Sequence, residues 1–112
     1  MLARANRLKR ADDYRNVVRR GKRIRTPHTV VYFVDGSAER QARLGFIVSK
    51  AVGNAVTRNL VRRRLKALGR GMLGSLPSGT DIVIRATPGV DQLSWALLQE
   101  ELMSGMNRMW KK

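Results

Sequence analysis

The chain has 112 residues, of which 43% are hydrophobic, so it suits a single domain with a packed core and excludes wholesale disorder. Its formal net charge of +15 favours a polyanionic partner, with nucleic acid ahead of an anionic membrane or an acidic protein. The absence of cysteine excludes disulfides, thiolate catalysis and cysteine-bound zinc, and it agrees with a cytoplasmic location.

A basic segment and a short helix are predicted at the start of the chain. Residues 1–10 are rich in arginine and lysine and are expected to be irregular and flexible. A helix is predicted over 12–20, because two aspartates occupy its first turn, two arginines occupy its last turn and a glycine follows. Tyr14, Val17 and Val18 share one side of this helix at helical spacing.

Three strands are predicted next. A short strand is expected over 22–26, and a second over 28–34, where β-branched and aromatic residues dominate. The turn signal Asp35-Gly36-Ser37 precedes a third predicted strand over 42–49. The second and third strands are therefore expected to pair as a hairpin.

A basic helix, a strand and a final helix complete the predicted domain. The basic helix is expected over 54–70, followed by a glycine-rich loop and a strand over 81–86. The last helix is predicted from residue 91 towards residue 110, with an apolar stripe expected to cover the sheet: Trp95, Leu98, Leu102, Met106 and Met109. The order α-β-β-β-α-β-α predicts one α+β domain over 1–112, with three helices and a four-stranded, mainly antiparallel sheet.

Most of the positive charge is concentrated in two segments. Residues 1–25 hold ten basic residues and two acids, whereas residues 50–70 hold seven basic residues and no acid. On a helix of about 100° per residue, an arc of roughly 140° collects the polar side chains of the second segment. This arc contains Arg58, Asn59, Arg62, Arg63, Lys66 and Arg70. Guanidinium groups at this density suit phosphate oxygens, because each is planar and permanently charged.

The sequence contains no constellation that would support catalysis by the protein itself. His28 is the only histidine, so a multi-histidine metal site is excluded and a serine–histidine–acid set has no basis. Asp12 and Asp13 are adjacent and diverge by about 100° on a helix, which suits a helix start better than a metal site. No catalytic residue, metal ligand or cofactor is therefore predicted in the chain.

The basic segment resembles the signature region of the bacterial ribonuclease P protein subunit. The family helix combines Gly-Asn-Ala, Arg-Asn-Arg and a closing pair of basic residues. Here Gly53-Asn54-Ala55-Val56, Arg58-Asn59 and Val61-Arg62-Arg63 match this pattern. Leu60 departs from it, because the family usually has arginine at this position. Arg64 lies about 40° from Leu60 on the helix and is expected to replace part of the missing charge.

The resemblance extends along the rest of the chain. Asn6-Arg7-Leu8-Lys9 and Asp13-Tyr14 are similar to the N-terminal stretch of the family. The segment 44–50 resembles its Gly-x-x-Val-Ser-Lys strand, and 81–86 resembles its late apolar strand. Ordered matches over the whole length make the similarity specific.

The resemblance implies a function in transfer RNA maturation. In this family the RNA subunit, together with Mg²⁺, hydrolyses the bond that releases the 5′ leader from precursor transfer RNA. The protein binds that RNA through its basic helix and holds the single-stranded leader in a cleft between its first helix and its sheet. The family fold has a β-α-β crossover through the basic helix. The resemblance implies no cofactor in the protein, no membrane and no obligate protein partner.

Two groups of residues are predicted to contact RNA. The first belongs to the signature helix and its approach: Lys50, Gly53, Asn54, Arg58, Asn59, Arg62, Arg63, Arg64 and Lys66. The second is assigned to the leader cleft, which needs flat side chains for bases and cations for phosphates: Tyr14, Val18, Tyr32, Phe46, Ser49 and Arg85. Val18 stands where the family has a second aromatic residue, so a smaller stacking surface is expected.

Two other functions fit the composition. A structural RNA-binding protein, such as one resembling a ribosomal protein, would have the same charge, and only the ordered motif matches separate it from a ribonuclease P subunit. A duplex-DNA binder would place the basic helix in the major groove. Affinities for folded RNA and duplex DNA at matched salt would distinguish this last possibility.

Overall fold

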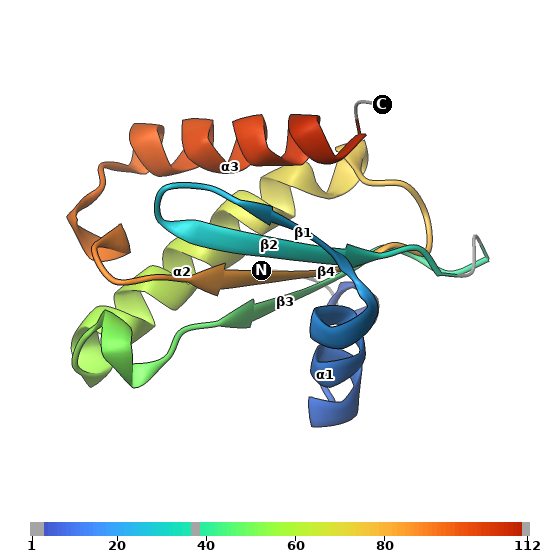
Figure 1. Cartoon of the computed structure of the whole chain (residues 1–112), viewed down its shortest axis with the longest axis horizontal. Coiled ribbons are helices and arrows are strands. Elements are labelled where there is room, and N and C mark those ends of the chain that lie inside the picture. The colour runs from blue at the N-terminus through green and yellow to red at the C-terminus, as the bar shows by residue number, and fades with distance from the viewer. Residues whose placement is uncertain (1–3, 37–38, 111–112) are drawn as a thin grey trace.

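The computed structural model describes residues 4–36 and 39–110, and its helices and strands follow the predicted order (Figure 1). They are α1 (Ala11–Arg20), β1 (Lys22–Arg25), β2 (Thr29–Val34), β3 (Arg43–Ile47), α2 (Ala55–Met72), β4 (Asp81–Ala86) and α3 (Trp95–Trp110). The predicted α+β class is confirmed. Within the described residues, no helix combines the length and the hydrophobicity needed to cross a bilayer.

The four strands form a mixed sheet in the order β1-β2-β4-β3. β2 is antiparallel to both β1 and β4, whereas β3 is parallel to β4. The predicted hairpin between residues 28–34 and 42–49 is therefore wrong, because β4 lies between these two strands. β4 takes the central position because it is apolar on both faces, and Ile82, Val83 and Ile84 are all 0% exposed.

The basic helix forms the connection between the two parallel strands. The chain leaves β3, runs through α2 and returns as β4, beside the strand it left. A parallel pair requires such a long connection, because a tight turn can only join antiparallel neighbours. The crossover expected from the family resemblance is thus present in this chain.

Helices cover both faces of the sheet (Figure 1). On one face, Ile82 of β4 belongs to the main core together with Leu65 of α2 and Leu102 of α3. Successive strand residues point to opposite faces. Val83 accordingly faces the other side, in a smaller core with Val17 of α1. α2 therefore has one face fixed to the sheet and its opposite face free for solvent or a partner.

The apolar stripe of α3 is only partly a core element. Leu98 and Leu102 are 0% exposed and Met106 is 5% exposed, as predicted. Trp95, the first residue of α3, is instead 44% exposed. The side chain of Met109 lies outside the described residues.

The segment before α1 is attached to the edge of the sheet. The backbone N–H of Leu8 donates to the carbonyl of Leu44 at 2.9 Å, and Asn6 Nδ2 donates to the carbonyl of Ala42 at 2.8 Å. Leu8 is 5% exposed. The part of the segment that bonds to β3 is therefore attached through a buried leucine, which the expectation of an irregular segment over 1–10 did not include. Residues 1–3 lie outside the described residues.

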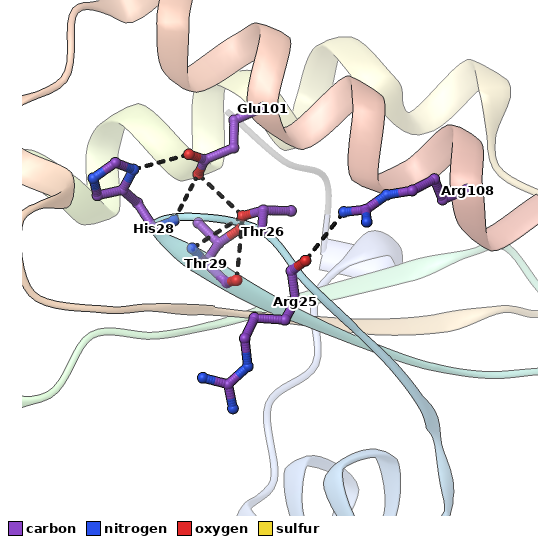
Figure 2. Close-up of polar contacts among 6 residues, drawn as sticks. All are labelled: Arg25, Thr26, His28, Thr29, Glu101 and Arg108. Carbon is purple, nitrogen blue, oxygen red and sulfur yellow. Dashed lines mark hydrogen bonds and ion pairs between the residues drawn. The ribbon is translucent and has the colours of Figure 1, made fainter.

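A polar cluster fastens α3 to the turn between β1 and β2 (Figure 2). Glu101 Oε1 lies 2.9 Å from His28 Nδ1, and Glu101 Oε2 accepts hydrogen bonds from Thr26 Oγ1 at 3.0 Å and from the backbone N–H of His28 at 3.2 Å. Gly105 permits the close approach of α3, because a Cβ there would lie 2.8 Å from Thr26 Cγ2. The only histidine of the chain thus has a structural contact.

Glu101→Ala is expected to lower the free energy of unfolding by about 2 kcal/mol, because it leaves the backbone N–H and the imidazole of His28 without their hydrogen-bond partner. Urea denaturation measures this change, and amide hydrogen exchange at His28 should accelerate. Glu100→Ala, at the exposed neighbouring position, is the control and should stay within about 0.5 kcal/mol of wild type. Equal stability of the two variants would contradict a role for the cluster.

Candidate nucleic-acid interface

The residues that precede α2 set the start of the basic helix. Asn54 Oδ1 accepts a hydrogen bond from the backbone N of Thr57 at 2.9 Å and so caps the helix. A Cβ at Gly53 would lie 2.9 Å from Thr57 Cγ2, so the close approach of the chain favours glycine here. Gly53 and Asn54, both predicted to contact RNA, therefore have a structural role at this helix end.

One face of α2 carries a basic ridge, which consists of Arg58, Asn59, Arg62, Arg63, Lys66 and Arg70. Asn59, Arg63, Lys66 and Arg70 are exposed, and Arg58 and Arg62 are half-buried. On the opposite face, Val61 is 1% exposed and Leu65 is 0% exposed. The amphipathic pattern predicted for this helix is confirmed, and packing of the apolar face turns the ridge outwards.

The ridge keeps its positive charge. Among residues 4–36 and 39–110, carboxylates pair with Arg15, Arg40 and Arg43 and contact His28, and none pairs with a ridge cation. The guanidinium and ammonium groups of Arg63, Lys66 and Arg70 thus face solvent. Such a concentration of unpaired charge attracts a polyanion over a distance of about 10 Å at 0.1 M ionic strength.

Two ridge arginines, Arg62 and Arg58, are partly buried and differ in their contacts. Arg62 Nη1 donates to Asn59 Oδ1 at 3.0 Å, and Arg62 Nη2 lies 3.5 Å from the carbonyl oxygen of Val48. Arg58 Nε is buried and has no hydrogen-bond partner in the described structure. These contacts limit the rotamers of Arg62, so less conformational entropy is lost when it binds an anion.

Arg64 has a structural contact that the sequence did not indicate. Its Nη1 donates to the carbonyl of Leu93 at 3.0 Å, in the segment that leads into α3. This contact ties Arg64 of α2 to the segment before α3, and the partial replacement by Arg64 of the charge missing at Leu60 stays a prediction. The ridge has no cation at position 60.

A buried carboxylate neutralises two arginines outside the ridge. Asp81, at the start of β4, accepts bonds from Arg43 Nε at 2.9 Å and Nη2 at 2.8 Å, and from Arg40 Nη1 at 2.9 Å. Burial disfavours the charged carboxylate, but the arginine hydrogen bonds outweigh it and hold the pKa of Asp81 below its ordinary value. Arg40 and Arg43 are thus structural cations, in contrast to those of the ridge.

The ring of Tyr14 packs against β3. Its ring occupies the space above Gly45, where a Cβ would lie 2.7 Å from the Tyr14 ring carbons. The Tyr14 hydroxyl accepts a hydrogen bond from the backbone N–H of Phe46 at 3.3 Å and donates to the carbonyl of Leu8 at 3.4 Å. Any larger residue at position 45 would displace the ring, so the glycine fixes the place of the aromatic side chain.

A cleft of about 400 Å³ opens beside Tyr14, at the edge of β3. Its lining combines flat or apolar side chains with cations: Arg7, Leu8, Lys9, Tyr14, Leu44, Phe46 and Lys66. Lys66 belongs both to this lining and to the ridge, so the cleft and the ridge form one continuous surface. The arrangement offers rings to bases and cations to phosphates, as single-stranded nucleic acid requires.

Of the remaining residues predicted for the leader cleft, Tyr32 is buried, whereas Val18, Ser49 and Arg85 are exposed. Tyr32 is 5% exposed and packs in the smaller core under α1, so its ring is a core element and not a stacking surface. Val18 is 37% exposed. Ser49 and Lys50 are exposed where β3 leads into α2. Arg85 is exposed, and by strand alternation it lies on the α1 side of the sheet, like Val83.

Several residues of this surface were not among the predicted contacts. Arg7 and Lys9 line the cleft because the N-terminal segment pairs with β3 through a bridge between Arg7 and Leu44. A second hollow of about 470 Å³ continues from them towards Arg10 and Asp13. The charge of 1–25 indicated an anion-binding region, but only the tertiary bridge shows which cations meet the cleft.

A protein-family model described as Ribonuclease P matches residues 2–110 of the chain. The chain belongs to the ribonuclease P protein family. A ribonuclease P protein component from Clavibacter michiganensis is 55% identical over 108 residues, which cover 96% of each chain. Another from Streptomyces avermitilis is 41% identical over 97% of this chain and 95% of its own length. The family resemblance inferred from the motifs is thereby confirmed.

Solved ribonuclease P proteins have the same fold. The Staphylococcus aureus protein superposes with a TM-score of 0.83 at 25% identity, over 96% of this chain and 97% of its own. The Thermotoga maritima protein gives a TM-score of 0.80 at 25% identity, over 91% of this chain and 96% of its own. Membership in the ribonuclease P family establishes the broad function: an RNA-binding protein component of an endoribonuclease in transfer RNA processing, with the ribonuclease P RNA as its partner.

Proposed function

We propose that this chain clamps the ribonuclease P RNA with its basic ridge and holds the 5′ leader of precursor transfer RNA in the cleft beside Tyr14. The RNA subunit, with its Mg²⁺, breaks the phosphodiester bond. The protein supplies binding and orientation only. It acts in the cytoplasm, the location expected from its cysteine-free sequence.

The observation that carries this proposal is the exposed, unpaired charge of the ridge. Arg63 and Lys66 have no carboxylate partner among the described residues, although the same chain pairs Arg40 and Arg43 with Asp81. A folded domain that leaves such a row unneutralised is destabilised by self-repulsion, and a bound polyanion relieves that repulsion.

The cleft suits a single strand of variable sequence. Tyr14 and Phe46 offer ring surface, and Arg7, Lys9 and Lys66 offer cations to successive phosphates. Stacking and phosphate contacts tolerate any base, because every base has a π-face and every nucleotide a phosphate. Leader binding in this proposal therefore depends on the presence of an unpaired strand and not on its sequence.

The proposal assigns the metal chemistry to the RNA. Across the described ranges, no three histidine or carboxylate side chains come together as metal ligands. In this proposal the chain contributes to Mg²⁺-dependent hydrolysis electrostatically. Its cations neutralise RNA phosphates whose mutual repulsion would otherwise have to be screened by a high concentration of salt or metal ions.

Reconstitution tests the proposal. Purified protein should accelerate leader removal by the cognate catalytic RNA at low magnesium, where the RNA alone is slow. Transfer RNA that lacks the 5′ leader should bind the complex more weakly than the precursor that carries it. A protein that changes neither cleavage nor leader-dependent binding at any salt concentration would overturn the proposal.

A further inference from the structure

A groove between α2 and α3 lies beside the ridge, away from the cleft. It has a volume of about 170 Å³, with walls formed by Ala67 and Gly71 of α2 and by Trp95, Gln99 and Met103 of α3. A drug-sized ligand generally needs about 300–1,000 Å³. The groove therefore has room for one small planar group rather than for an extended ligand.

The walls of the groove are unusually apolar for an exposed site. Trp95 and Met103 are each 44% exposed, and the buried Leu102 forms part of the lining. None of the lining residues carries a negative charge. Trp95 and Met103 lie about two helical turns apart in this lining, and the half-exposed indole of Trp95 presents a flat, polarisable surface that suits stacking by an aromatic ring.

Cations flank the groove on one side only. On a helical wheel, Arg63 and Arg70 lie about 40° and 60° from Ala67, both towards the ridge. Both side chains are exposed. A polyanion seated on the ridge therefore passes close to the opening of the groove, with its phosphates on the arginines and an unpaired base within reach of Trp95.

The missing cation at position 60 extends the apolar character of this side of α2. Val56 is 78% exposed, and Leu60 is half-buried. Both lie within about 20° of Ala67 on the helical wheel, so they continue the apolar line from the groove towards the start of α2. Arg64, which borders this line, is bonded to the Leu93 carbonyl. Apolar contacts with bases can thus accompany phosphate contacts along the helix.

We propose that the α2–α3 groove binds one unpaired base of the ribonuclease P RNA, stacked on Trp95, while Arg63 and Arg70 hold the adjoining phosphates. This inference rests on the proposed function, since it takes the RNA seated on the ridge as given. It adds a second base-binding site, which is separate from the leader cleft and in which α3 supplies the stacking residue.

Fluorescence of Trp95 tests the inference directly. The chain has two tryptophans, so Trp110→Phe provides a background in which the signal comes from Trp95 alone. Titration with the cognate catalytic RNA should quench this fluorescence, because a stacked base contacts the indole. An RNA duplex without unpaired bases should quench it far less. Equal quenching by both RNAs, or none by either, would overturn the inference.

Affinity measurements separate stacking from structural effects. In the same background, Trp95→Leu should weaken binding of the catalytic RNA by at least about fivefold, whereas Trp95→Phe should retain most of the affinity, because stacking requires a flat ring. Leu97→Ala removes another exposed apolar side chain of α3, 55% exposed, and should leave affinity unchanged. Circular dichroism verifies that each variant folds.

The failure of this inference is distinguishable from failure of the proposed function. If wild-type protein and Trp95→Leu bind the catalytic RNA equally well while Arg63→Glu/Lys66→Glu does not, the groove is not a base site and the ridge function stands. If wild-type protein does not bind the RNA at all, both fail. Sedimentation that shows self-association lost in Trp95→Leu would also overturn the inference, because the groove would then bind a second copy of the chain.

Discussion

Arg63→Glu/Lys66→Glu is expected to weaken binding of the catalytic RNA by at least about 100-fold, because hydrogen bonds to charged groups are each worth about 1.5–3 kcal/mol. The slope of log affinity against log salt should fall by about 0.7–0.9 for each lost phosphate contact. Filter binding or fluorescence anisotropy across a salt series measures both quantities.

Two variants control for the change in net charge. Arg63→Lys/Lys66→Arg keeps the charge and should retain most of the affinity. Arg19→Glu/Arg20→Glu changes the net charge by the same amount at the end of α1, which packs on the opposite face of the sheet from α2. Equal losses from both reversals would show that net charge alone drives binding and would remove the ridge as a specific interface.

Asp81→Asn is expected to lower the free energy of unfolding at pH 7 by about 2 kcal/mol, because it leaves the guanidinium groups of Arg40 and Arg43 facing a neutral side chain. The loss should be smaller than the roughly 3–5 kcal/mol typical of a broken, fully buried pair. Arg40 and Arg43 are 34% and 27% exposed, so water can partly replace the carboxylate. Urea denaturation provides the measurement.

The same ion pair predicts how stability depends on pH. Its carboxylate has a pKa in the folded state below that in the unfolded chain, which is about 3.9. The contribution of Asp81 is therefore complete above the unfolded pKa and is lost as pH falls through the folded pKa. Asp81→Asn should lose less stability than wild type over this acidic range. Asp12→Asn, which breaks an exposed pair with Arg15, should change stability by less than about 1 kcal/mol.

Local sequence patterns predicted the helices and strands, but they did not predict which strands pair in the sheet. The strand over 28–34 and the strand over 42–49 have the composition of a hairpin, and the turn signal between them is strong. The sheet instead pairs each of them with β4, whose Ile82, Val83 and Ile84 are buried on both faces of the sheet. Pairing is decided by burial across the whole sheet, and strand composition contains little information about the identity of the partner.

The ridge could be predicted because it depends on helical periodicity alone. The roles of individual side chains could not, since they depend on contacts far away in sequence. Arg64 bonds to Leu93, and Tyr32 is buried by α1. Asn54 has a local signal that could have assigned its role, because asparagine before a helix is a preferred N-cap. Asn54 was assigned to RNA by the family motif, although its side-chain oxygen caps α2.

The central position of β4 has a consequence for synthesis of the protein on the ribosome. Until residues 81–86 have emerged, β3 lacks its strand partner in the sheet, and the pair of β1 and β2 is marginal alone. The apolar face of α2 has no completed sheet to cover it until then. About three quarters of the chain must therefore be translated before the nucleic-acid-binding form can assemble. Any earlier contact between the basic segment and RNA involves a chain that has not yet folded.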